Sequence, residues 1–261
     1  MKRCLLLLPF VALLTGCYTV PETGRKSLML VSVGQETQLG AASFADLKSK
    51  GKVSNDAQKN ATVQRVGTRI AHAVGDALPG AEWEFVLFDD ESPNAFALPG
   101  GKVGVHTGLF EFAQTDDELA IVMGHEIAHV TARHGSERMS QTILMAAGGV
   151  GLDIALREKD SSQRQLALAA YGLVGTGAVI LPFSRLNENE ADEIGLRYAA
   201  RAGYDPRAAL DFWRRMKEES EGKSKPPEWM STHPSDDTRI RKLEQFMPIA
   251  LEEYELSKTK Q

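Results

Sequence analysis

Residues 115–139 read Thr-Asp-Asp-Glu-Leu-Ala-Ile-Val-Met-Gly-His-Glu-Ile-Ala-His-Val-Thr-Ala-Arg-His-Gly-Ser-Glu-Arg-Met. Within this stretch, His125 to His129 form an H-E-x-x-H motif. Residues four apart share one face of a helix, so both imidazoles can point at one metal ion there. Glu126 follows the first histidine, at a position from which its carboxylate can reach a water molecule held by the metal. The alternative is a pair of buried histidines satisfied by hydrogen bonds.

A helix is expected here independently of the motif. Thr115 with Glu118 three residues later predicts a capping box, and Asp116 and Asp117 favour the positive N-terminal end of a helix. Apolar residues then recur at helical spacing. They are Leu119, Ile121, Val122, Met123, Ile127 and Val130. The motif therefore lies where a metal-binding helix would place it, which favours a metal site over a structural pair.

The N-terminus has the features of a processed segment. A positive start and a short apolar run end at Leu14-Thr15-Gly16-Cys17, which resembles a bacterial lipobox. We therefore expect a lipoprotein signal peptide over residues 1–16, with lipid attached to Cys17. Tyr18, rather than an aspartate, follows the cysteine, and by resemblance to lipoprotein sorting rules this favours the outer membrane, facing the periplasm. The alternative is an ordinary signal peptide with a coincidental cysteine.

Composition narrows the class of protein further. The chain has 261 residues and a formal net charge of −5, with no basic run, which argues against nucleic-acid binding. Loss of Cys4 with the signal would leave Cys17 alone, so no internal disulfide is expected. We predict a lipidated cysteine and tether over residues 17–33, followed by one domain over residues 34–261.

Three short strands are predicted just before the motif. They cover residues 83–88, 95–98 and 102–106, with Pro99-Gly100-Gly101 as the turn between the last two. We expect a small antiparallel sheet beside the motif helix, with residues 94–98 on its edge. An edge strand can pair with the backbone of an extended substrate. The alternative is an interior hairpin whose edge faces solvent.

The remaining elements are expected to be helical. Predicted helices cover residues 34–49, 56–78 and 184–202, and two more follow Asp205 and Ser235. Residues 142–183 are unusually apolar, and we predict a helical hairpin packed over or beside the active site. The alternative is a segment inserted in a membrane, because residues 166–183 carry no charge and reach the lower length limit for a span.

A catalytic zinc site uses three protein ligands and keeps one position open. The third ligand is expected in the run Asn187-Glu188-Asn189-Glu190-Ala191-Asp192-Glu193. Three glutamates, Glu188, Glu190 and Glu193, are candidates, and only Glu188 has an aspartate four residues later on the same helix face. Asp192 would then orient a ligating histidine through its free ring nitrogen.

With these motifs the sequence resembles the zinc metallopeptidase family that includes HtpX and the type I CAAX prenyl proteases (peptidase family M forty-eight), and within it the bacterial outer-membrane lipoproteins. The resemblance implies an α+β, mostly helical, gluzincin-like metalloprotease domain, with one zinc ion held by His125, His129 and Glu188. It further implies that Asn94, Ala95 and Phe96 form the substrate strand.

Three other residues complete the predicted site. The resemblance implies that His233, in Thr-His-Pro, stabilises the oxyanion, although a surface loop histidine is the alternative. His134 follows His129 by five residues and should orient a neighbour or lie at the surface, rather than bind metal. Arg185 and Arg239 are candidates for pairing with the carboxylates of the site.

The predicted function is zinc-dependent cleavage of unfolded or misfolded envelope proteins, with Glu126 as the base and Cys17 as the membrane anchor. The chain could act as a homo-oligomer or with a partner protease or chaperone. Two alternatives remain. One is a periplasmic chaperone or assembly factor with a latent zinc site, and the other is a structural zinc lipoprotein, against which Glu126 argues.

Overall fold

The computed structural model describes residues 17–175, 181–220, 229, 233 and 237–259, so the predicted signal peptide lies outside the described residues. The helices are α1 (Val33–Lys50), α2 (Ala57–Val74), α3 (Asp116–Thr131), α4 (His134–Ala155), α5 (Ser161–Gly175), α6 (Leu181–Arg201), α7 (Ala208–Ser220) and α9 (Asp237–Lys258). The strands are β1 (Cys17–Thr19), β2 (Lys26–Leu28), β3 (Glu84–Phe88), β4 (Ala95–Leu98) and β5 (Lys102–His106), and η1 (Gly75–Ala77) and η2 (Thr107–Glu111) are short 3-10 helices. The predicted α+β, mostly helical class is confirmed.

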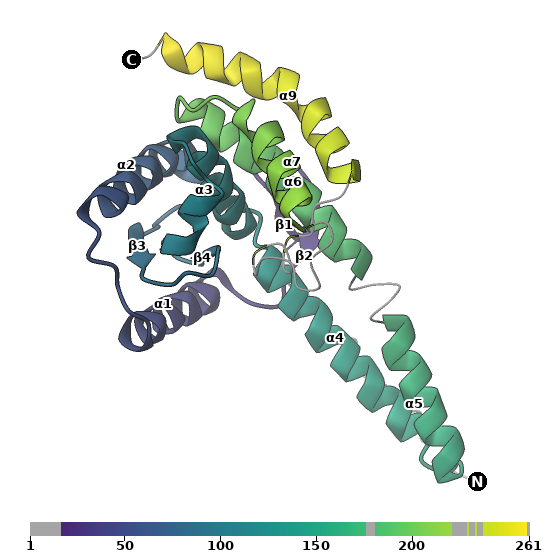
Figure 1. Cartoon of the computed structure of the whole chain (residues 1–261). Helices are drawn as coiled ribbons and strands as arrows, with labels where there is room; N and C mark the ends of the chain where they lie inside the picture. The colour runs from purple at the N-terminus through teal and green to yellow at the C-terminus, as the bar shows by residue number, and fades with distance from the viewer. Residues whose placement is uncertain (1–16, 176–180, 221–228, 230–232, 234–236, 260–261) are drawn as a thin grey trace.

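Helices α3 and α6 cross at the centre of the body (Figure 1). Two glycines allow the close crossing. A Cβ atom on Gly195 would lie 2.6 Å from the backbone nitrogen of His125, and one on Gly124 would lie 2.7 Å from the carbonyl oxygen of Gly195. Real Cβ atoms do not approach backbone so closely. The two helices that carry the predicted metal ligands are therefore in direct backbone contact.

The sheet beside α3 has the order β3-β5-β4. β4 pairs antiparallel with β5, as the predicted turn requires, but β3 pairs parallel with β5. The predicted antiparallel sheet is therefore wrong in one pairing, and the sheet is mixed. The chain passes from β3 to the far edge before it returns to the middle, and the predicted position of β4 on an edge is confirmed.

Residues 17–28 form a β-hairpin instead of the predicted tether. β1 and β2 pair antiparallel from Cys17↔Leu28 to Thr19↔Lys26. Val20 is fully buried, and the Tyr18 hydroxyl donates a hydrogen bond to the carbonyl oxygen of Thr131 at the end of α3. The hairpin is thus packed on the same core as the metal-motif helix.

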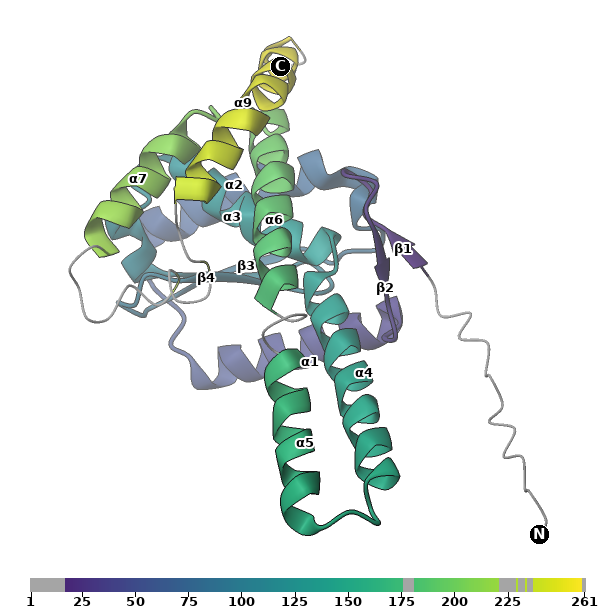
Figure 2. The same cartoon turned by 90° about the vertical axis from the view of Figure 1, so that its right-hand side faces the viewer.

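Helices α4 and α5 form the predicted helical hairpin, but most of it extends away from the body (Figures 1 and 2). Only the start of α4 lies beside the groove described below, so the prediction that the hairpin packs over or beside the site fails for the rest of its length. The outer part exposes large apolar side chains such as Val150 and Leu166. Among the described residues, none of the helices combines the length and the apolar character that a membrane crossing requires.

Candidate metal centre

The motif helix begins as its sequence predicts, with one change. The Thr115 side chain accepts a hydrogen bond from the backbone N–H of Glu118. The Glu118 carboxylate instead accepts from the N–H of Gln114 and pairs with Arg215 at 2.6 Å. Half of the predicted capping box is therefore present, because the buried Glu118 carboxylate bonds to Gln114 and Arg215 instead of to the backbone N–H of Thr115.

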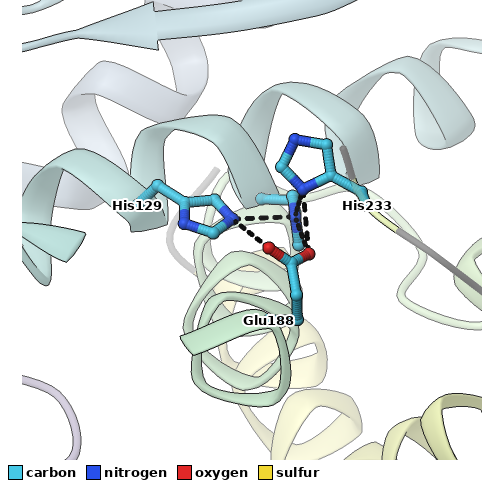
Figure 3. A group of neighbouring side chains, drawn as sticks. His129, Glu188 and His233 are labelled. Carbon is cyan, nitrogen blue, oxygen red and sulfur yellow. Dashed lines mark hydrogen bonds and ion pairs between the residues drawn. The ribbon is translucent and has the colours of Figure 1, made fainter. Parts of the chain in front are cut away.

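Glu188 of α6 faces His129 of α3 (Figure 3), and His125, one turn earlier on α3, belongs to the same cluster. The two Nε2 atoms are 3.1 Å apart, and the carboxylate oxygens of Glu188 lie 3.3 Å from Nε2 of His125 and 3.5 Å from Nε2 of His129. Ligands at the usual 2.0–2.1 Å from a tetrahedral zinc ion are about 3.3 Å from one another. Two imidazoles and one carboxylate at this spacing fit a zinc ion.

The same cluster includes His233. Its Nδ1 lies 2.8 Å from Oε2 of Glu188 and 3.1 Å from Nε2 of His125, while its Nε2 lies 3.5 Å from Oε1 of Glu126. The alternative of a surface loop histidine does not fit this position. His233 stands beside both the predicted ligands and the predicted base, where it can hold an oxyanion or provide a fourth donor.

The ionisation of the cluster reflects its burial and its charges. Burial lowers the pKa of His125, but hydrogen bonds to Asp192 and Glu188 outweigh it and raise the pKa to about 9. For His129, burial and the nearby His125 hold the pKa well below its ordinary value, which leaves a neutral imidazole. Burial would raise the pKa of Glu188, but hydrogen bonds from His125 and His233 lower it far below the ordinary value. Because neutral imidazole and ionised carboxylate are the forms that bind a metal, His129 and Glu188 are in the binding form, whereas His125 must first lose a proton.

Asp192 stands behind His125, as predicted from its spacing to Glu188. Its Oδ1 lies 3.0 Å from Nδ1 of His125, and Arg239 donates to both of its oxygens at 2.6 and 2.8 Å. The predicted pairing of Arg239 with a carboxylate of the site is therefore present, whereas Arg185 is exposed. Burial alone would raise the pKa of Asp192, but the charge of Arg239 outweighs burial, and the pKa lies below its ordinary value.

Two further contacts were not foreseen from the sequence. The indole N–H of Trp229 donates to Oε1 of Glu126 at 2.7 Å, and Trp229 is fully buried. His134 is buried too, with Nδ1 2.9 Å from Nδ1 of His129 and Nε2 2.9 Å from Oε2 of Glu190. His134 thus lies against His129, a position that fits one of the two roles expected for it, and Glu190 lies behind His134 rather than at the metal position. No local sequence pattern predicted the contact between Trp229 and Glu126, which are 103 residues apart.

A groove of about 420 Å³ opens beside the cluster. Its lining includes Glu126, His129 and Glu188, the β4 segment from Asn94 to Pro99, and the first turns of α4. The predicted substrate residues Asn94, Ala95 and Phe96 therefore share one groove with the predicted base and with two of the three predicted ligands, His129 and Glu188.

Comparisons with known proteins agree with this arrangement. The family model described as "Peptidase family M48" matches residues 57–247. The chain is 33% identical over 230 residues to the beta-barrel assembly-enhancing protease of Escherichia coli, covering 85% of this chain and 46% of that protein. It is 35% identical over 240 residues to the mitochondrial metalloendopeptidase OMA1 of Schizosaccharomyces pombe, covering 88% and 66%. The chain spans about half the length of the bacterial relatives it matches.

The family model covers most of the chain, including the motif helix, β4 and the helix that carries Glu188. The predicted family and the predicted class of enzyme, a metalloendopeptidase, are therefore confirmed, and the family implies a metal in the cluster of histidine and glutamate side chains. The chain belongs to peptidase family M48.

Proposed function

We propose that this protein is a zinc endopeptidase that cleaves extended segments of unfolded or misfolded envelope proteins. The observation that carries the proposal is the groove in which His129, Glu188 and the Glu126 carboxylate lie along the edge of β4, with His125 buried directly behind them in the same cluster of donors. Three donors with one carboxylate left over is the composition of a catalytic zinc site, since a structural site would use a fourth ligand and needs no base.

The roles follow from position. His125, His129 and Glu188 would hold the zinc ion, which when bound lowers the pKa of a water molecule and polarises the scissile carbonyl. Glu126 takes the proton at its carboxylate and passes it to the leaving amine. Trp229 fixes one oxygen of that carboxylate, so the other is the oxygen available for the proton. His233 donates to the developing oxyanion.

The edge of β4 would bind the substrate backbone. Antiparallel strands alternate between residues that hydrogen-bond to the partner strand and residues that point their N–H and C=O outward. The N–H of His106 donates to the carbonyl of Asn94, so residues 94, 96 and 98 bond to β5. Ala95 and Ala97 therefore direct their backbone groups away from β5, and of the two Ala97 is the more exposed, since Ala95 is buried. Binding through backbone groups selects extended chains with little dependence on sequence.

Lipid attachment at Cys17, in the outer membrane and facing the periplasm, would give the protease its place beside such substrates. Support comes from the lipobox-like sequence before Cys17 and from similarity to proteases named for enhancing β-barrel assembly. Cys17 is exposed at the start of β1, where an acyl chain has room. A homo-oligomer or a partner protease or chaperone would be compatible with the exposed α4–α5 hairpin.

Cleavage of casein by the mature chain, compared with its Glu126→Gln variant, tests the proposal. The variant should retain zinc, because Glu126 is not a ligand, and lose cleavage by a factor of a thousand or more, on the order expected when the base is removed. A stable folded protein should resist cleavage while its denatured form is cut. Equal cleavage of the folded and denatured forms would contradict the substrate class.

A second candidate function, a chaperone or assembly factor with a latent zinc site, is favoured by one observation. Nδ1 of His233 lies as close to Glu188 and His125 as a fourth ligand would. His233→Ala distinguishes the two readings. Cleavage should fall if His233 stabilises the oxyanion, and should rise if His233 closes the site.

A further inference from the structure

The N-terminal hairpin contacts the candidate metal centre through a continuous chain of hydrogen bonds. Arg25, next to β2, donates from Nε to Oε2 of Glu190 at 2.7 Å, and the hydroxyl of Thr23 donates to Oε1 of the same carboxylate. Oε2 of Glu190 lies 2.9 Å from Nε2 of His134, and Nδ1 of His134 lies 2.9 Å from Nδ1 of His129. Three elements far apart in sequence thus meet behind one predicted ligand.

We propose that Glu190 and His134 are positioning residues that hold His129 in the tautomer that binds metal, and that Arg25 and Thr23 of the N-terminal hairpin hold Glu190 in place. The proposal rests on the proposed function in that His129 is taken as a metal ligand. It adds residues from outside the H-E-x-x-H and Glu188 motifs, and it makes the hairpin a part of the centre.

The direction of the chain follows from which atoms can donate. The ionised Glu190 carboxylate can only accept hydrogen bonds, as it does from Arg25 and Thr23. Nε2 of His134 therefore carries a proton and donates a hydrogen bond to Glu190. With one proton on the His134 ring, Nδ1 of His134 is an acceptor, and Nδ1 of His129 donates to it. Nε2 of His129 is left with a free lone pair, and that atom faces Glu188 and His125.

Burial makes this order hard to reverse. His134 and Glu190 are 4% and 7% exposed, so water does not replace the lost partner if either bond breaks. A buried carboxylate is retained only when it is paired, and Arg25 provides the pairing charge. The same guanidinium forms a two-point bond with Glu137 of α4 at 2.8 and 2.9 Å, which fixes it between α4 and α6.

The contacts behind His129 resemble the contacts behind His125, the other predicted histidine ligand. There Asp192 accepts from the histidine ring and is held by Arg239. On His129 the carboxylate is one side chain further away, and His134 fills the gap. Each predicted histidine ligand is thus oriented by a carboxylate that an arginine holds, and partners of this kind set ring orientation and ligand basicity.

The test measures zinc affinity of the mature chain by competition with a chromophoric chelator. His134→Leu removes the acceptor for Nδ1 of His129 and should weaken zinc binding about 10- to 100-fold, the range observed when such partners of a ligand are removed. His134→Gln offers one acceptor and one donor on the same side chain and should recover most of the affinity. Affinity of the leucine variant within twofold of the wild type would overturn the proposal, as would equal loss in both variants.

Glu137→Gln is the matched control for loosening of the hairpin. It removes one of the two carboxylates that hold Arg25 but leaves the contact between His134 and Glu190. It should lower the unfolding temperature of the metal-free protein and keep zinc affinity within about twofold. A loss of zinc affinity equal to that of His134→Leu would mean that loosening the hairpin alone weakens zinc binding. That result would overturn the proposal that Glu190 and His134 position His129.

Zinc affinity is measured without substrate, so this result is independent of cleavage. A chain that binds zinc but does not cut casein would contradict the proposed function. The His134→Leu and His134→Gln variants would still test whether His134 and Glu190 position His129.

Discussion

The indole N–H of Trp229 donates to Oε1 of Glu126 over 2.7 Å, inside the core. The Trp229 ring stacks on that of Trp213 at 5.0 Å, and the guanidinium of Arg239 lies 3.5 Å above the Trp213 ring. Arg239 in turn holds Asp192 behind His125. One aromatic stack thus supports both the proposed base and the carboxylate behind a proposed ligand.

Trp229→Phe should reduce kcat while zinc content and KM stay close to those of the wild type. The phenyl ring keeps the stack but cannot donate to Glu126. A hydrogen bond to a charged group is worth about 1.5–3 kcal/mol, which corresponds to a roughly 10- to 100-fold loss of rate. Steady-state kinetics on a quenched peptide measure it, with Trp83→Phe as a control because Trp83 stacks on Phe85 outside the site. An unchanged kcat in Trp229→Phe would refute the positioning of Glu126.

Ala97→Pro should weaken substrate binding without disturbing the sheet. Proline removes the outward N–H of Ala97, and edge strands tolerate proline where the N–H faces away from the partner strand. One lost hydrogen bond of about 0.5–1.5 kcal/mol should lower kcat/KM up to about tenfold. Ala97→Val keeps the N–H and serves as the control. Equal kcat/KM in the two variants would mean that the substrate does not pair with β4.

Zinc affinity should depend on pH because His125 must lose a proton to bind metal. Its pKa of about 9 in the metal-free protein lies above the ordinary value of 6.5. Protonation of His125 therefore stabilises the metal-free fold fully below about pH 6.5, and this stabilisation is lost as the pH rises through about 9. Affinity should therefore increase about tenfold per pH unit between pH 7 and 9 and level off above. Chelator competition at four pH values measures the slope. A flat profile over that range would show that His125 binds metal without releasing a proton.

Gly195→Ala should destabilise the protein and weaken zinc binding together. The added methyl group would meet the backbone of α3 beside His125. Overpacking of this kind costs about 1–3 kcal/mol, or roughly 2–12 °C in unfolding temperature for a domain of this size. It should also move Glu188 away from the two histidines. Gly151→Ala in α4 is the control, since its Cβ would meet nothing within 4 Å. Wild-type zinc affinity in Gly195→Ala would mean that the crossing does not set the ligand spacing.

Local signals predicted much of this fold. The cap at Thr115 and the apolar spacing that follows it placed α3, and Pro99-Gly100-Gly101 placed the turn between β4 and β5. The resemblance to a family motif predicted Glu188 and Asp192 at the cluster, and helix periodicity explains why both side chains share one face of α6. Their roles as ligand and orienting residue stay predictions, as does the role of His233.

What depends on long-range contacts could not be predicted. The parallel pairing of β3 with β5 depends on which neighbour the strand meets, and the residues of β3 fit either edge. β1 and β2 have three residues each, too few for a periodic signal, and they are held through contacts such as that of Arg25 with Glu190. The bond between Trp229 and Glu126 joins residues 103 positions apart, and no local pattern reports such a pair.

The packing of the β1–β2 hairpin limits how far the folded body could move from a lipid attached to Cys17. A flexible linker over residues 17–33 would allow an average distance of about 20–25 Å between the domain and its lipid. β1 instead begins at Cys17 itself, and Tyr18 and Val20 are fixed to the body within three residues. With lipid on Cys17, the folded body would stay within a few residues of the membrane surface, and the groove would meet only chains that pass close to the bilayer.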